Sequence, residues 1–421
     1  MKAGATARRA ALEILRQVRK GQPFNTIHGD LQGLPVADRH LAHEIAAGVL
    51  RHRSELDRRI RPLIRGKWQN VEPDLRDLLR IGTYQMEFLD RVPDYAAVTV
   101  TVEVARDTRG RKAAGLVNAV LRRVAAIRDA PVEPPEVLDH VRKLAADQSH
   151  PAWLVKRWLQ RFGRSRTAKL MEHNNRPPPV TIQALHWSTD RLREELTAAN
   201  VTFAESEAGP GLVVRGTPVQ QLPGYEEGGF IVQDPSQARL LEFAQVPPNS
   251  LVWDACASPG GKAARLSMQG LVIASEARRS RLQRLRDTLA RTSPDSLILL
   301  ADARHPPLKS SKIDVTLVDA PCSATGTIAR HPDARWRLSE RHIGLMGKRQ
   351  TEILDGASES VGPGKLLIYI TCSLENEENE DQVDRFLQRH VDFTRACADL
   401  LLFPPDIGAD GGYAARLRRS Q

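Results

Sequence analysis

The first third of the chain carries apolar residues at helical spacing. Between about residues 5 and 145 they recur every three or four positions, with few runs of β-branched residues. This period places the apolar side chains on one face of a helix, so it predicts an all-helical domain. Residues 7–20 follow the same pattern, with Leu12, Leu15 and Val18 on one face. We therefore interpret this Arg-rich start as a folded first helix and not as a transit peptide.

The pattern changes after a proline-rich segment. Residues 129–135 read Asp-Ala-Pro-Val-Glu-Pro-Pro, a composition that ends helices and marks a boundary or linker. Helical spacing resumes over residues 151–170. Strand-like pieces then follow at 180–185 and 211–215, separated by a helix-like piece at 189–200. These pieces predict a small α+β module of RRM-like content.

From Leu251 onward, short continuous apolar runs alternate with helical stretches. Such runs are typical of strands buried on both faces of a parallel sheet, and the alternation predicts a doubly wound α/β domain. The five runs begin at Leu251, Leu271, Leu297, Ile313 and Lys365. Four of them end in a carboxylate: Asp254, Glu276, Asp302 and Asp319. Because ligands bind beyond the carboxyl ends of parallel strands, we expect these four side chains to face one crevice.

Length and charge refine this division. The 421 residues, 41% apolar and 27% charged, suit a soluble chain of two or three domains. The formal net charge is +10, and residues 1–150, with 26 basic and 19 acidic side chains, hold seven of the ten surplus charges. This excess favours a nucleic-acid partner held by the helical domain. We expect a helical domain over 1–145, the α+β module over 146–240 and the α/β domain over 241–421.

Several classes of protein are disfavoured. No run approaches the roughly 18 to 20 apolar residues of a membrane span, and no apolar core follows the N-terminal charges as in a secretory signal. We therefore expect a cytoplasmic protein with no membrane partner. The four cysteines, Cys256, Cys322, Cys372 and Cys397, lack Cys-x-x-Cys spacing. In a chain of this size, that argues against structural disulfides and zinc, and we expect no metal site.

A turn of small residues follows the first predicted strand. In Asp254-Ala-Cys-Ala-Ser-Pro-Gly-Gly-Lys262, Gly260 and Gly261 allow the backbone to approach a ligand. A P-loop would need a glycine six residues before the lysine and a hydroxyl after it, where this chain has Cys256 and Ala263. The G-x-G-x-x-G dinucleotide fingerprint is absent as well. ATP, GTP, nicotinamide and flavin cofactors are therefore disfavoured.

A nucleoside held by acids at the strand ends is the cofactor that remains. Glu276, twenty-two residues after Asp254, is placed to accept hydrogen bonds from ribose hydroxyls. Asp302, after the third strand, can reach an adenine edge. The alternative is that these acids only cap helices.

Two cysteines also follow strand ends. Cys322 lies in Asp319-Ala-Pro-Cys-Ser-Ala-Thr-Gly326 after the fourth strand, and Cys372 lies in Thr371-Cys-Ser373 after the fifth. These strands are neighbours in the usual doubly wound order, so we expect the two thiols side by side at the cofactor crevice. A lone cysteine is most often a small buried hydrophobe, which is our interpretation of Cys397. The pair formed by Cys322 and Cys372 indicates a chemical role and not a packing role.

Thiols beside a nucleoside cofactor suit methylation of a pyrimidine. Carbon 5 of cytosine is too weak a nucleophile to take a methyl group from a sulfonium, and covalent catalysis overcomes this. A thiolate adds to carbon 6, carbon 5 attacks the methyl group, and a base removes the carbon 5 proton so that the thiolate leaves. One cysteine serves the attack and a second suits product release. A carboxyl group such as Asp319 can hydrogen-bond the ring edge.

These motifs resemble those of the RNA cytosine-5 methyltransferases, and specifically the bacterial 16S ribosomal RNA branch called the RsmB/Fmu/Sun family. In the last domain the resemblance is carried by Cys256–Lys262, Asp319–Gly326, Arg330–Asp333 with Trp336, and Tyr369–Ser373. In the first domain Leu79–Gln85, Val92–Val98 and Gly115–Arg123 are similar to the NusB-like RNA-binding domain. The resemblance covers nearly the whole chain and implies a class I (Rossmann-like) methyltransferase domain.

The resemblance also implies roles that spacing alone leaves open. Cys372 falls on the nucleophile and Cys322 on the thiol that assists release, with Asp319 as the third catalytic residue. The implied cofactor is S-adenosyl-L-methionine. Its contacts fall on Cys256, Ala257, Ser258, Pro259, Gly260, Gly261, Lys262, Glu276, Asp302 and Asp319. Glu276 replaces a more common Asp, which keeps the acceptor.

Two positions depart from the family pattern. The strand Thr181-Ile-Gln-Ala184 lacks the Arg and Asn often found there, and Gly412 stands where an aromatic residue is usual. Both bear on substrate fit and not on the chemistry. We interpret the acidic run Glu375–Asp381 as complementing the dipole of the following helix and not as a metal site. Trp336, close after Cys322, is a candidate for contacting the flipped base or its neighbour.

The expected activity is methylation of a cytosine in small-subunit ribosomal RNA through a covalent cysteine adduct, by a monomeric enzyme. Two alternatives stay open. One is the same chemistry on transfer RNA. The other is a non-catalytic RNA-binding assembly or antitermination factor in which the methyltransferase domain is vestigial.

Overall fold

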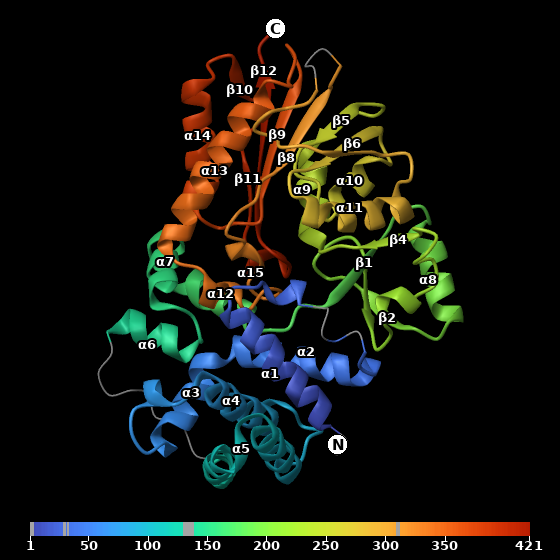
Figure 1. Ribbon diagram of the computed structural model, residues 1–421. Coiled ribbons are helices and arrows are strands. Elements are labelled where there is room, and N and C mark those ends of the chain that lie inside the picture. The colour runs from blue at the N-terminus through green and yellow to red at the C-terminus, as the bar shows by residue number, and fades with distance from the viewer. Residues whose placement is uncertain (1–3, 28–30, 32, 129–138, 309–311) are drawn as a thin grey trace. The chain divides into compact units, whose positions relative to one another are not determined.

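The computed structural model describes residues 4–27, 31, 33–128, 139–308 and 312–421 (Figure 1). The linker predicted at 129–135 lies outside these residues. The chain forms two compact units. The helical unit comprises residues 1–176 and 328–338, and the sheet unit comprises 177–327 and 339–421. Residues 328–338, which we call the strap, therefore belong to the helical unit although they lie within the sequence of the α/β domain.

The described residues of the helical unit form helices, short turns and loops. The helices are α1 (Ala5–Arg19), α2 (Val36–Arg51), α3 (Arg53–Ile60), α4 (Pro73–Phe88), α5 (Asp94–Ala126), α6 (His140–Asp147), α7 (Ala152–Asn174) and, in the strap, α12 (Ala334–Arg337). The helical spacing at the start of the chain is thereby confirmed, including the first helix. α5 bends at Gly110, whose φ of 84° is outside the helical range.

Helix α4 forms the centre of the helical unit. Residues Leu78–Met86 are all buried, as expected for a helix covered on every side. α4 packs against α1, α2, α3 and α5. The apolar stripe on α1 that includes Leu12 and Leu15 contributes to the same core. The apolar residues that recur every three or four positions thus form the core between α4 and the helices around it.

The sheet unit begins with a small antiparallel sheet. Its elements are β1 (Val180–Ala184), α8 (Thr189–Ala198), β2 (Thr202–Glu205), β3 (Leu212–Arg215) and β4 (Phe230–Val232). The strand order is β2-β3-β1-β4. The two predicted strands and the predicted helix are confirmed. The strands β2 and β4 were not predicted, because one is short and largely exposed and the other has only three residues.

The larger sheet contains all five predicted strands. They are β5 (Leu251–Asp254), β6 (Leu271–Glu276), β7 (Leu297–Leu300), β8 (Val315–Asp319) and β9 (Leu366–Thr371). The order is β10-β12-β9-β8-β5-β6-β7, and β5 to β9 pair in parallel. The antiparallel strands β10 (Phe393–Arg395), β11 (Leu400–Leu402) and β12 (Gly412–Arg419) complete this sheet beside β9.

Both faces of this sheet are buried. Successive strand residues point to opposite faces, so Val252 and Trp253 enter different cores. The first core includes α9 (Pro235–Ala244), α10 (Gly261–Leu266) and α11 (Arg279–Thr292), and the second includes α13 (Glu340–Ser358) and α14 (Glu380–Arg389). Figure 1 shows α13 and α14 on one face and α10 and α11 on the other. The doubly wound arrangement brings the carboxyl ends of the parallel strands to one edge.

Candidate active site

The thiols of Cys322 and Cys372 lie side by side at this edge. Their Sγ atoms are 3.1 Å apart, and neither is in a disulfide. Cys322 follows β8 and Cys372 follows β9, and these strands pair in parallel with Asp319 opposite Ile370. The hydrogen bond with Cys372, and then burial, hold the pKa of Cys322 well above its ordinary value. The expectation from strand order, that the two thiols meet, is confirmed.

A lysine and a carboxylate form a close pair next to the thiols. Lys262 Nζ lies 2.7 Å from Asp319 Oδ2. Burial lowers the pKa of Lys262, but the ion pair with Asp319 more than offsets this, and the nearby Cys372 adds to the rise. Lys262 is therefore a charged ammonium that fixes Asp319 beside the thiol pair.

Three of the four predicted strand-end acids gather around Cys256. Asp254 is fully buried, its Oδ1 accepts a 3.4 Å hydrogen bond from the Cys256 N–H, and its Oδ2 has no partner in the described part of the chain. Burial and then Asp319 raise the pKa of Asp254 to about 7. Burial also raises the pKa of Cys256, with further contributions from Asp254, Asp319 and Glu276. These carboxylates are therefore close enough to act on one thiol.

The turn Cys256–Lys262 connects β5 to α10. Gly260 has a φ of 112°, a conformation that residues with a side chain rarely adopt, and a Cβ there would lie 3.1 Å from Thr288 Cγ2. The Ala257 N–H donates to the Ser275 carbonyl at 2.9 Å. The turn is thus fixed against β6 and α11, with Gly260 packed under α11 side chains and with room beside Gly261, where the nearest atom to an added Cβ is 3.5 Å away.

Asp302 differs from the other predicted acids. It lies two residues beyond β7, and its carboxylate accepts from both the backbone N–H and the guanidinium of Arg304, at 3.0 and 2.7 Å. These hydrogen bonds hold the pKa of Asp302 below its ordinary value. Its carboxylate is therefore already engaged by a neighbour.

Glu378 is a site residue that our sequence analysis missed. It is fully buried and accepts hydrogen bonds from the Ser323 N–H at 2.8 Å, from Gln350 Nε2 at 3.2 Å, and from the hydroxyls of Ser323 and Ser373. Ser323 follows Cys322 and Ser373 follows Cys372. One carboxylate therefore joins the two cysteine loops. Burial raises the pKa of Glu378, although the serine hydrogen bonds oppose this.

The interpretation of the acidic run is therefore correct only in part. Glu380 and Asp381 occupy the first turn of α14, as expected for residues that complement a helix dipole. Glu378 precedes that helix and serves the cysteine loops instead. The available signal was the asparagine next to it: Asn379 bonds both Thr371 and Ser373, and polar residues of this kind after a strand end suit a buried network better than a solvated cap.

Trp336, the candidate for contacting the flipped base, makes its observed contacts within the helical unit. It belongs to the strap in the helical unit, and its indole N–H donates to the Leu50 carbonyl at 2.6 Å. Its ring packs against the core of that unit and lies under the guanidinium of Arg53. The interpretation of Trp336 as a partner of the flipped base stays a prediction: sequence proximity to Cys322 did not translate into membership of the same unit.

The two places where the sequence departs from the family pattern, Gly412 and the strand of residues 181–184, are both in contact with other parts of the sheet unit. A Cβ at Gly412 would lie 2.9 Å from Leu240 Cδ1 and 3.0 Å from the Thr371 carbonyl, so this chain has no room there for an aromatic ring. In β1, Gln183 Oε1 accepts from Arg265 at 2.8 Å, and the Ala184 carbonyl accepts from the same guanidinium. Both positions are filled by contacts within the sheet unit.

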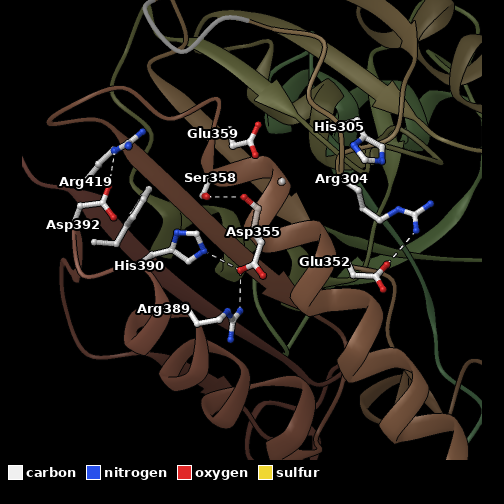
Figure 2. Close-up of a pocket in the computed structure, with 12 residues that line it drawn as sticks. Arg304, His305, Glu352, Asp355, Ser358, Glu359, Arg389, His390, Asp392 and Arg419 are labelled. Carbon is white, nitrogen blue, oxygen red and sulfur yellow. Dashed lines mark hydrogen bonds and ion pairs between the residues drawn. The ribbon is translucent and has the colours of Figure 1, made fainter.

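A charged hollow of about 690 Å³ lies elsewhere in the sheet unit and contains none of the predicted site residues (Figure 2). Asp355 accepts from Arg389 and His390 at 2.8 and 2.9 Å, and Arg419 pairs with Asp392 at 2.8 Å. Because these charges already neutralise one another, we assign no chemistry to this hollow. Within the described ranges, His, Cys, Asp and Glu form no cluster of three or more suited to a metal ion. The described helices include none that could span a membrane.

Comparison with known proteins identifies the family. Residues 5–126 match the NusB family, 150–220 match a ferredoxin-like domain of RsmF/B-like methyltransferases, and 243–414 match the family described as 16S rRNA methyltransferase RsmB/F. Ribosomal RNA small subunit methyltransferase B of Vibrio cholerae is 32% identical over 410 residues, which cover 94% of this chain and 93% of that protein. The chain belongs to the ribosomal RNA small subunit methyltransferase B family. The resemblance found in the sequence is thereby confirmed.

Another relative and two solved structures are similar to this chain. The Escherichia coli methyltransferase B is 34% identical over 393 residues, covering 91% of this chain and 90% of its own length. The crystal structure of PH0851 shares the fold over 100% of both chains, with a TM-score of 0.82 at 23% identity. A methyltransferase homologue from Pyrococcus horikoshii shares it over 67% of this chain and 100% of its own, with a TM-score of 0.57 at 21% identity. The three-part fold of NusB, ferredoxin-like and Rossmann-like methyltransferase domains is therefore that of the family.

Proposed function

We propose that this protein uses S-adenosyl-L-methionine to methylate carbon 5 of a cytosine in 16S ribosomal RNA, through a covalent adduct between Cys372 and carbon 6. The observation that carries the proposal is the thiol pair, with 3.1 Å between its sulfur atoms, beside the pair Lys262 and Asp319. A single thiol would suffice for a nucleophile. Two adjacent thiols suit a reaction in which one forms the adduct and the other assists its resolution.

The residues at the strand ends fit the proposed cofactor. Among the described residues, Asp254 Oδ2 is buried without a hydrogen-bond partner. Gly261 in the turn has nothing closer than 3.5 Å to an added Cβ, and Glu276 provides a carboxylate at the end of β6. We propose that the contacts come from Cys256, Ala257, Ser258, Pro259, Gly260, Gly261, Lys262, Glu276, Asp302 and Asp319. When bound, S-adenosylmethionine supplies an electrophilic methyl group.

The protein's own residues account for the remaining steps. The Cys372 thiolate forms a bond to carbon 6, which turns carbon 5 into an enamine-like nucleophile able to take the methyl group. Removal of the carbon 5 proton by a base then breaks the bond between sulfur and carbon 6 and returns the thiolate. Asp319, fixed by Lys262, can hydrogen-bond the ring edge, and Cys322 assists release. The choice of Cys372 over Cys322 as nucleophile rests on the family pattern.

The proposal is tested with labelled cofactor and separated RNA classes. We expect label in 16S ribosomal RNA and none in transfer RNA. Cys372→Ala should lower transfer by at least about 1000-fold, as for loss of a covalent nucleophile, while calorimetry shows unchanged S-adenosylmethionine binding. Cys397→Ala, at a cysteine outside the thiol pair, is the matched control and should keep full activity.

The same experiment separates the alternatives. Label in transfer RNA alone would establish the same chemistry on a different substrate. A protein that binds no S-adenosylmethionine would instead support the non-catalytic assembly factor. Methyl transfer that survives Cys372→Ala would refute the covalent mechanism proposed for this residue. The proposal describes a cytoplasmic enzyme that acts as a monomer without a metal.

A further inference from the structure

Arg53, the first residue of α3 in the helical unit, is a cation without an acceptor. Among the described residues its guanidinium makes no hydrogen bond and no ion pair. It lies over the ring of Trp336, 5.1 Å from the ring centroid. Burial, followed by the nearby charge of Arg80, lowers the pKa of Arg53 to about 10. The side chain is therefore still charged at neutral pH, although it is partly removed from water.

Arg53 faces a hollow of about 360 Å³ in the helical unit. The apolar part of its lining includes Val18 of α1 and Val49 of α2, and one wall is formed by Trp336 and Arg337 of the strap. The Trp336 indole is fixed in place by its hydrogen bond to the Leu50 carbonyl. The hollow is thus a formed concavity with one aromatic wall and a charged rim.

The other arginines that line the hollow are neutralised by carboxylates. Arg19 and Arg80 both contact Asp77, and Arg337 Nε lies 2.6 Å from Asp333. Arg53 is different because both nearby carboxylates, Asp57 and Asp77, are engaged by Arg80. Within the described residues, the hollow therefore keeps a positive charge that no carboxylate or other hydrogen-bond acceptor of the protein contacts.

A partly desolvated cation without a partner lowers stability, so its presence calls for a ligand of opposite charge. We propose that this hollow binds a backbone phosphate of the RNA substrate, with the Arg53 guanidinium as donor. The planar guanidinium presents paired N–H groups that match two phosphate oxygens, and stacking on Trp336 leaves those groups available. This inference rests on the proposed function, in which the substrate is RNA.

The strap makes this site a property of the whole chain. The match to the NusB family ends at residue 126, whereas the wall formed by Trp336 and Arg337 comes from the sequence that follows β8. Arg335, in the same strap, donates to the carbonyls of Arg51 and Ser149 at 3.2 and 3.0 Å and so holds the strap on the helical unit. A helical domain without the strap would lack one side of the hollow.

The test measures binding of a 16S ribosomal RNA transcript to the full-length protein at several salt concentrations. Arg53→Met keeps most of the side-chain volume and removes the charge. We expect about tenfold weaker binding, a salt slope reduced by about 0.7 to 0.9, as for loss of one phosphate contact, and a melting temperature that is unchanged or higher. Arg53→Lys should keep the slope and bind with intermediate affinity.

Arg128→Met is the matched control, because Arg128 is exposed in the same unit and pairs with Asp94. The inference is overturned if Arg53→Met binds like this control, if it weakens binding without changing the salt slope, or if its melting temperature falls. If the hollow stacked a base in place of binding a phosphate, Arg53→Met would weaken binding without changing the salt slope. A wild-type protein that neither binds nor methylates the transcript would instead refute the proposed function. Methylation by the wild type together with control-like binding by Arg53→Met would refute only the phosphate site.

Discussion

Two charged side chains of this molecule have opposite surroundings. One is Glu378, beside the two cysteine loops of the sheet unit, and the other is Arg53, in the hollow of the helical unit. Glu378 is fully buried and accepts hydrogen bonds from both cysteine loops and from Gln350. Arg53 is partly buried and makes no hydrogen bond to any residue that the structure describes. A buried charge whose partners are all protein groups fixes those groups in place. A buried charged side chain without hydrogen-bond partners reduces stability and remains available to a ligand.

Arg335 provides a second example of a charge with protein partners, in the same unit as Arg53, although its Nε makes no hydrogen bond within the described residues. It is fully buried, and its guanidinium donates to the carbonyls of Arg51, Ser149 and Asn174 and to the side chain of Asn175, at 2.8 to 3.2 Å. Burial lowers its pKa. Because Arg335 and Arg53 both belong to the helical unit, an arginine with protein acceptors can be compared there with an arginine that has none among the described residues.

The largest expected effect on stability comes from Arg335→Met. It leaves several buried acceptors without a donor, at about 1 to 3 kcal/mol each, so we expect the free energy of unfolding to fall by about 3 kcal/mol or more. Urea denaturation of the full-length protein measures this. Arg53→Met serves as the control and should leave the midpoint unchanged or raise it. Equal losses for the two variants would remove the distinction between them.

The next effect concerns Glu378 and is seen in the rate. Glu378→Ala removes the acceptor shared by Ser323 and Ser373, and we expect methyl transfer about 100-fold slower, which corresponds to about 2.7 kcal/mol in the barrier. S-adenosylmethionine binding should not change. Glu378→Gln keeps an acceptor for the Ser323 N–H and should lose only about tenfold.

Glu380→Gln, in the first turn of α14, is the control for removing a nearby charge. We expect its rate to match that of the wild type. If Glu378→Ala were as active as Glu380→Gln, Glu378 would have no role in positioning the thiol loops.

Taken per pH unit, the smallest effect is a dependence of stability on pH. Burial raises the pKa of Asp254 to about 7 in the folded protein, against an ordinary value near 4. Between these values the folded protein keeps a proton that the unfolded chain releases, so rising pH favours unfolding by up to about 1.4 kcal/mol per pH unit. Below about pH 4 and above about pH 7 Asp254 has the same charge in the folded and unfolded chain, so it adds no dependence of the free energy of unfolding on pH. Asp254→Asn should therefore lose less stability than the wild type between pH 4.5 and 7, whereas parallel curves would show that Asp254 titrates normally.

Much of the site could be predicted because it follows from strand order. Each continuous apolar run became a strand, and a parallel sheet necessarily brings the residues after β8 and β9 together, which is why Cys322 and Cys372 could be paired from the sequence. Asp254 and Glu276 were predicted for the same reason: they are the last residues of β5 and β6, where position along the chain determines position in space. Lys262, the second residue of α10, was predicted from the turn after β5.

The residues that escaped prediction depend on contacts across the chain. Glu378 joins two loops and lies 55 residues along the chain from Ser323 in the first of them, and its acidic neighbours obscured its different environment. Trp336 follows Cys322 closely in sequence, yet the carbonyl groups that bind Arg335 hold the strap on the helical unit. Neither periodicity nor spacing reveals which remote backbone groups lack a donor.

The covalent role of the thiol pair is tested most directly by trapping the adduct. Cys322→Ala removes the thiol that assists release, and we predict an RNA–protein complex that survives a denaturing gel when 16S ribosomal RNA and S-adenosylmethionine are present. The double variant Cys322→Ala with Cys372→Ala should give no such complex. Turnover by Cys322→Ala at the normal rate without a stable adduct, or an adduct that persists without Cys372, would contradict the account.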